Sequence, residues 1–200
     1  IKRLGAIVSA NAYYPTALAD NYSKAGLGPE RANSMVRMGD VERAGISYSY
    51  HSDMPMAPAQ PLFLMHCGVN RTTQSGRVAA PEQRVSREGA WKAVTLEAAY
   101  SLQLEKEMGS IVPGKLANFT ILDDNPVTCD PIKIKDITVW GTIHEGRVLP
   151  ASPDKKLTNA LADPTRALTT SHGRWFDEEP STQGLFGAST KRNANAACPP

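Results

Sequence analysis

Short apolar runs and helix-like segments alternate along the first hundred residues of the chain. Residues 6–11 and 46–50 are rich in β-forming side chains and have the length of buried strands. Gly28-Pro29-Glu30 predicts a helix start, because Pro suits a first turn and an acid is favoured there, and Gly45 suits the helix end. Further helices are expected over residues 61–69, 87–94 and 96–104. This order predicts a parallel α/β unit in which helices cover a buried sheet.

Local signals predict how some of these segments begin. Tyr13-Tyr14-Pro15 has the composition of a loop, so a long connection is expected between the first strand and the helix at Gly28. Ser86 and Thr95 are each expected to cap the helix that follows, because a hydroxyl oxygen can accept from the free N–H groups of a first turn.

The sequence pattern changes near residue 107. Strands are expected over residues 118–122, 137–144 and 148–149, the last two joined at Glu145-Gly146 as a hairpin. We therefore predict three parts: an α/β part over residues 1–106, a small β module over 107–150, and an extended tail over 151–200. The tail is poor in apolar residues, so we expect it to wrap the body or a partner rather than to fold alone.

Composition narrows the classes of partner. The chain has 22 Lys and Arg against 20 Asp and Glu, a formal charge of +2, which gives no field that would indicate nucleic acid or an anionic membrane. No run approaches the roughly 18 apolar residues that cross a bilayer.

Three cysteines without a C-x-x-C pair are interpreted as free thiols, although Cys129 and Cys198 could pair in an exported protein. The start at Ile1 has no leader-like segment, so we expect it to be processed or cut, and cytoplasm and periplasm both remain open.

The residues after the second predicted strand are the main candidates for chemistry. Asp53 lies in Ser49-Tyr50-His51-Ser52-Asp53-Met54-Pro55, and the carboxyl ends of parallel strands form the active edge of α/β folds. Its carboxylate could bind a divalent metal and accept a proton from water; the alternative is a loop Asp that forms an Asx-turn before Pro55. His51 precedes Asp53 by two residues and shares its side of an extended chain, so it could contact a substrate or support the site. The alternative is a surface or structural histidine.

Four tyrosines lie near the two predicted strand ends. Tyr13 and Tyr50 could line a pocket mouth, or they could be β-forming residues with polar tips at a rim, and the same choice applies to Tyr14 and Tyr48.

Other motifs are missing. The sequence has no H-x-H, H-E-x-x-H or C-x-x-C pair, so spacing assembles no complete metal site. It has no G-x-S-x-G elbow, phosphate-binding loop or dinucleotide-binding turn either. The neighbours His66 and Cys67 are interpreted as packed residues, because adjacent residues of a helix face different directions.

Several stretches, in the right order, resemble the metal-dependent amidohydrolases. Residues 109–126, GSIVPGKLANFTILDDNP, closely resemble the segment G-[ST]-[IL]-x-x-G-K-x-A-D-[FL]-x-[VI]-L-D-x-[DN]-P that closes these enzymes, with Asn118 where the family usually has Asp. Residues 51–55 resemble the family's [GH]-S-D-x-P element, residues 85–100 a helical pattern, and residues 137–148 the terminal strands. The sequence of residues 1–150 is most similar to the branch of this family that includes N-substituted formamide deformylases and exoenzyme-regulator-like proteins.

This resemblance implies a fold and a site. It implies the C-terminal part of a distorted TIM (β/α)8 barrel, with residues 7–11 and 46–50 as strands seven and eight, plus half of a small β-sandwich appendage. It also implies that Asp53 binds a divalent metal, one or two zinc ions or alternatively iron or manganese, and serves as general base. The family's H-x-H and its other ligands would come from an N-terminal portion or a second polypeptide, and an oligomer is expected.

The resemblance further implies an activity. The expected reaction is hydrolysis of a carbon–nitrogen bond in a small amide, formamide or cyclic amide by metal-activated water. Two alternatives stay open: a non-catalytic amidohydrolase-like subunit that makes regulatory or other protein contacts, and a small independent binding module.

Overall fold

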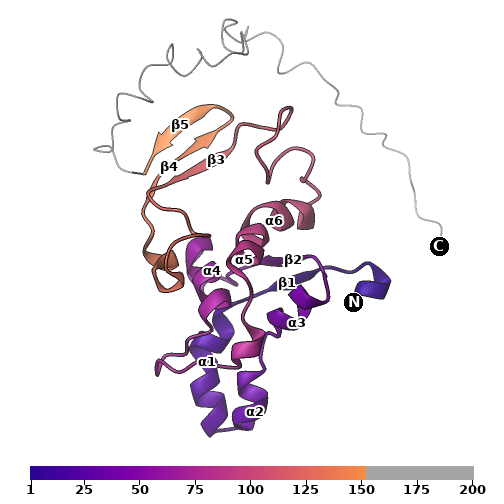
Figure 1. Ribbon diagram of the computed structural model, residues 1–200, viewed down its shortest axis with the longest axis vertical. Helices are drawn as coiled ribbons and strands as arrows, with labels where there is room; N and C mark the ends of the chain where they lie inside the picture. Colours follow the sequence, from indigo (N-terminus) through magenta and orange to yellow (C-terminus); the bar gives the residue numbers. More distant parts are fainter. Residues whose placement is uncertain (152–200) are drawn as a thin grey trace, which may run out of the picture. The chain divides into compact units, whose positions relative to one another are not determined.

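The computed structural model describes residues 1–151, so the predicted tail lies almost wholly outside the described residues. Its first part contains two parallel strands, β1 (Val8–Ala10) and β2 (Tyr48–Tyr50), which lie side by side in Figure 1. Val8 pairs with Tyr48 and Ala10 with Tyr50. Both predicted strands are confirmed, as is their parallel pairing, although each is shorter than its apolar run.

The two faces of this strand pair differ. Val8, Ala10, Tyr48 and Tyr50 belong to one hydrophobic core, because alternate residues of a strand share a face. The helices α4 (Pro61–Asn70) and α5 (Arg87–Val94) supply most of the rest of that core. The main contributions are Met65 and Val69 from α4, Ala90 and Ala93 from α5, and Met38, Val85 and Ile134. The opposite face carries small polar residues at the paired positions Ser9 and Ser49.

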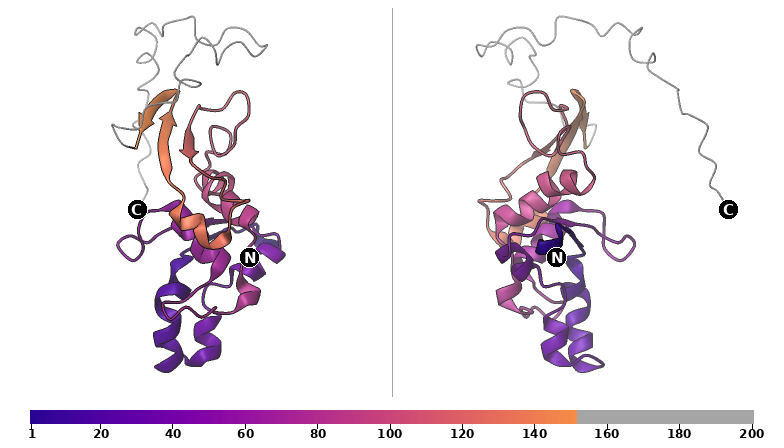
Figure 2. Two further views of the ribbon diagram at one scale, coloured as in Figure 1. Left: turned by 60° about the vertical axis from the view of Figure 1, so that its left-hand side comes forward. Right: turned by 90° about the vertical axis from the view of Figure 1, so that its right-hand side faces the viewer.

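Three helices connect β1 to β2. They are α1 (Tyr13–Lys24), α2 (Gly28–Asn33) and α3 (Met38–Arg43), with α1 and α2 packed together as an adjacent pair in Figures 1 and 2. The loop predicted at Tyr13 is wrong: α1 begins there, and Pro15 lies in its first turn, where no backbone N–H is needed. The helix predicted from Gly28 is divided in two, since Val36 has a φ of 52° that no α-helix accommodates.

The helix caps agree with the sequence in one case. The Ser86 hydroxyl oxygen accepts the N–H of Gly89 at 2.9 Å and begins α5, as predicted. The Thr95 hydroxyl instead donates to the Trp91 carbonyl at 2.8 Å, so its predicted capping role is wrong. The helix after it, α6 (Leu96–Ser101), ends three residues earlier than expected.

A buried arginine holds the segment that follows α4. Arg71, 2% exposed, donates from Nε to the carbonyl of Ala79 at 2.7 Å and from its other nitrogens to the carbonyls of Asn33, Met35 and Val36, each at 2.9 Å. Burial lowers the pKa of this guanidinium to about 10. Arg71 therefore ties the loop after α4 to the break between α2 and α3.

Short 3-10 helices complete the described residues; they are Lys2–Leu4, Pro81–Gln83 and Pro131–Asp136.

The second part of the described chain is an antiparallel sheet. Strands β3 (Phe119–Leu122), β4 (Val139–His144) and β5 (Arg147–Pro150) pair in that order, which confirms the predicted strands and the hairpin. The hairpin turn has positive φ at both central residues, Glu145 and Gly146, the geometry that suits the twist of paired strands. Asn118 accepts the N–H of Glu145 on its side-chain oxygen at 2.8 Å, so this position anchors the turn.

The GSIVPGK segment before β3 has a structural explanation. Lys115 donates from Nζ to the Glu105 carbonyl, to the Met108 carbonyl at 3.1 Å and to the Ser110 hydroxyl at 2.7 Å. Gly109 has a φ of 89°, and a Cβ placed there would lie 2.6 Å from the Cβ of Ala99 in α6. The segment is thus a tightly packed connection held by an internal ammonium group.

Within residues 1–151, no helix has both the length and the apolar character needed to cross a membrane.

Candidate functional site

The ends of β1 and β2 meet at one edge, because the strands are parallel. The N–H of His51 donates to the Ala10 carbonyl at 3.1 Å, which extends the pairing by one step. Asn11, 2% exposed, donates from Nδ2 to the Ser52 carbonyl at 3.0 Å and accepts the N–H of Tyr13 at 2.9 Å. One buried side chain therefore fixes both the start of α1 and the loop that contains Asp53.

Asp53 lies in a tight turn at this edge. Its carbonyl accepts the N–H of Met56 at 2.7 Å, while the Ser52 carbonyl accepts that of Ala57 at 3.1 Å. Its φ of 50° is in the left-handed region, which Asp tolerates better than most residues. The carboxylate is exposed, so a ligand can reach it.

Tyr14 touches this carboxylate from the first turn of α1. Its hydroxyl donates to Oδ2 of Asp53 at 2.9 Å. The hydrogen bond to Asp53 is the main reason that the pKa of Tyr14 is raised, since losing the phenol proton would break the bond and set two negative charges side by side. The hydroxyl therefore stays a donor toward Asp53 around neutral pH.

The other candidate residues occupy different surroundings. His51 is exposed on the same loop as Asp53. The ring of Tyr13 packs on that of Phe63 in α4, with centroids 5.4 Å apart. Tyr50 lies on the helix-covered face, where burial raises the pKa of its hydroxyl well above the usual value, and a Cβ at Gly68 would come within 2.2 Å of that oxygen. The structure thus brings Asp53 and Tyr14 together and directs Tyr50 into the core.

The surroundings of the Asp53 carboxylate decide whether the described residues alone can hold a metal ion. Among residues 1–151, no three His, Cys, Asp or Glu side chains are close enough to hold a metal ion. Asp53 supplies one exposed, hard oxygen donor, which suits a single position around a divalent metal. Among residues 1–151, Asp53 therefore offers one oxygen donor and no complete metal site is formed.

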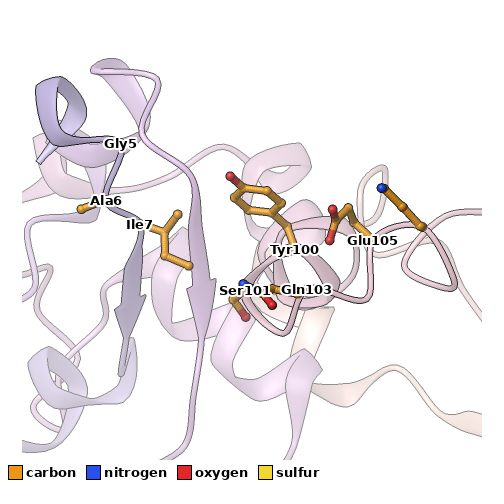
Figure 3. Close-up of a pocket in the computed structure, with 8 residues that line it drawn as sticks. Gly5, Ala6, Ile7, Tyr100, Ser101, Gln103 and Glu105 are labelled. Atoms are coloured by element: carbon orange, nitrogen blue, oxygen red, sulfur yellow. The ribbon is translucent and has the colours of Figure 1, made fainter.

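A cavity of about 560 Å³ lies elsewhere. Figure 3 shows it between the Gly5–Ile7 segment that leads into β1 and the residues from Tyr100 to Glu105 at the end of α6. It is therefore at the amino end of β1, whereas Asp53 follows the carboxyl end of β2. Its lining includes neither Asp53 nor His51, so it is not the site that the sequence predicted.

Comparisons with known proteins support one family. The model of the amidohydrolase family matches residues 1–150. An N-substituted formamide deformylase from Arthrobacter pascens is 32% identical over 103 residues, 52% of this chain and 19% of the deformylase. Protein LONG AFTER FAR-RED 3 from Arabidopsis thaliana is 39% identical over 75 residues, which are 37% of this chain and 13% of that protein.

A solved structure shares the fold. An uncharacterized metal-dependent hydrolase from Pyrococcus horikoshii OT3 matches 65% of this chain with a TM-score of 0.53 and 21% identity, over 26% of its own length. The chain thus spans about a fifth or less of the curated relatives and about a quarter of this structure. Since the family model matches three quarters of the chain, the chain belongs to the amidohydrolase family.

Proposed function

We propose that this chain contributes the Asp53 edge of a metal-dependent hydrolase site that cleaves carbon–nitrogen bonds in small amides, formamides or cyclic amides. Membership of the amidohydrolase family supports hydrolysis, and the relative named as a formamide deformylase supports this class of bond. The observation that carries the proposal is an exposed carboxylate at the carboxyl edge of two parallel strands, held by Tyr14 and by a turn anchored on Asn11. That edge is where α/β enzymes place their reacting groups.

Within this proposal, β1 and β2 are consecutive strands, seven and eight, of a larger barrel. Helices cover one of their faces, as on the outside of a barrel, and Ser9 and Ser49 would face the interior. The sheet β3-β4-β5 would be the half-sandwich appendage. The proposed boundaries remain residues 1–106 for the barrel part and 107–150 for the appendage.

The proposed chemistry assigns one role to Asp53. A divalent metal, zinc or alternatively iron or manganese, would lower the pKa of water and polarise a carbonyl when bound. Asp53 would hold the ion through one oxygen, accept the proton of the attacking water and return a proton to the leaving nitrogen. His51 lies on the same exposed loop and would contact the substrate, whereas we assign Tyr50 to packing beneath the strand.

A partner polypeptide, or an N-terminal portion, would complete the site. The pair β1 and β2 has no further strand on either edge within the described residues, and such unpaired edges favour addition of a strand. Several large apolar side chains beside the start of β1 and the end of α6 are also exposed, namely Ile1, Leu4, Ile7, Tyr100 and Leu102. Covering them would remove apolar surface from water.

Replacement of Asp53 in the complete enzyme, with every metal ligand present, tests the proposal. Asp53→Asn keeps the shape and the loop but cannot accept a proton, so turnover of a panel of small formamides and amides is expected to fall by about three orders of magnitude. Asp123→Asn, which changes an exposed carboxylate in the appendage, is the matched control and should retain activity. Unchanged turnover in Asp53→Asn would remove Asp53 from the mechanism.

A further inference from the structure

The position of Tyr14 is set by the chain immediately before it. The side-chain oxygen of Asn11 accepts the N–H of Tyr13, and the Asn11 carbonyl accepts the N–H of Tyr14 at 3.4 Å. These bonds begin α1 directly after β1, which directs its first turn toward the loop that follows β2. Nδ2 of the same Asn11 donates to the Ser52 carbonyl. The segments that contain Tyr14 and Asp53 are therefore both positioned by one buried residue.

Tyr14 engages one of the two oxygens of the Asp53 carboxylate. Its hydroxyl donates to Oδ2 at 2.9 Å, and a protonated phenol beside a carboxylate can only donate. A charge-assisted bond of this kind restricts rotation of the carboxylate plane. The oxygen Oδ1 is then the one presented away from Tyr14.

We propose that Tyr14 is a positioning residue for Asp53, which fixes Oδ2 so that Oδ1 alone meets a divalent cation. The inference rests on the proposed function of Asp53 and extends it to a residue on a different element, 39 positions away in the sequence. Partners of metal-binding carboxylates orient the ligand, and their loss commonly costs about 10- to 100-fold in metal affinity or activity. Tyr14 would therefore act through Asp53 and without touching the metal.

The test compares three variants of the complete enzyme. Tyr14→Phe removes only the donor and keeps the ring, Tyr22→Phe removes an exposed hydroxyl from the same helix, and Asp53→Asn removes the carboxylate. Co²⁺ is the probe, because its visible absorption reports ligand geometry. Its affinity is measured by competition with a coloured chelator, alongside kcat and KM.

The expected result separates the variants. Tyr14→Phe should bind Co²⁺ about 10- to 100-fold more weakly or lose kcat by a similar factor, with an altered absorption spectrum and a KM within about twofold of wild type. Tyr22→Phe should match wild type. If Tyr14→Phe matches wild type in spectrum, affinity and kcat while Asp53→Asn loses them, the positioning role is overturned and the function of Asp53 stands. If Asp53→Asn also binds Co²⁺ and turns over normally, both proposals are overturned.

Discussion

The side chain of Asn11 donates to the main-chain carbonyl of Ser52 at 3.0 Å, which joins the end of β1 to the loop after β2. Asn11 is almost completely buried, so its side-chain amide depends on partners within the protein. It also accepts the first N–H of α1. A single amide group thereby holds the three segments that position Asp53 and Tyr14.

Asn11→Asp tests this anchor. The new carboxylate keeps an acceptor for Tyr13 but sets a buried negative charge against the Ser52 carbonyl, where a donor is needed. We expect a loss of about 1–3 kcal/mol in the free energy of unfolding, measured by urea titration. Asn21→Asp, an exposed change on α1, should cost far less. Equal stability of the two variants would contradict an anchoring role for Asn11.

Gly109 and Gly114 allow packing and backbone conformation to be separated. Their φ angles are nearly equal, 89° and 91°, so alanine meets similar backbone strain of about 1 kcal/mol at either position. A Cβ at Gly114 meets nothing within 4 Å, whereas one at Gly109 meets Ala99 at 2.6 Å. Gly109→Ala should therefore destabilise the fold by about 1–3 kcal/mol more than Gly114→Ala in the same denaturation assay. Similar losses of stability in the two variants would show that α6 moves aside at little cost, which would contradict tight packing at Gly109.

The lowered pKa of Asp20 predicts how the stability of the fold changes at acid pH. Its carboxylate accepts the N–H of Ser75 and pairs with Arg77 at 2.7 Å, and the Ser75 bond is the main cause that lowers the pKa of Asp20 from 3.8 to about 2. A lowered pKa in the folded state contributes stability above pH 3.8 that is lost as pH falls toward 2. Asp20→Asn should thus lower Tm at about pH 6, and the difference from wild type should shrink toward about pH 2. A difference in Tm that stays constant with pH would contradict this contribution.

Much of the fold was predictable because local signals agreed with tertiary packing. The Ser86 cap, the apolar run of α4 and the Glu145-Gly146 turn each specify their element through short-range chemistry. The sequence does not indicate the start of α1, because Tyr-Tyr-Pro is common in loops, although Pro is also tolerated in a first turn. The partners of Arg71 were not predictable, because every residue has a backbone carbonyl and the residue type does not indicate which carbonyl accepts.

The candidate site was predictable in part for similar reasons. Asp53 follows a strand that the sequence identifies, so its place at the strand edge could be inferred. Tyr14 contacts Asp53 only because α1 begins one residue before it, and that start was not foreseen. Tyr50 alternates with Ser49 and shares its face with Tyr48, so the period of a strand could have indicated the buried face.

Anomalous diffraction from crystals of the complete enzyme, grown with Zn²⁺, tests the central proposal most directly. We expect an anomalous peak about 2.0–2.2 Å from Oδ1 of Asp53, with Tyr14 still bonded to Oδ2. A fully occupied zinc site that has no contact with the Asp53 carboxylate would contradict it.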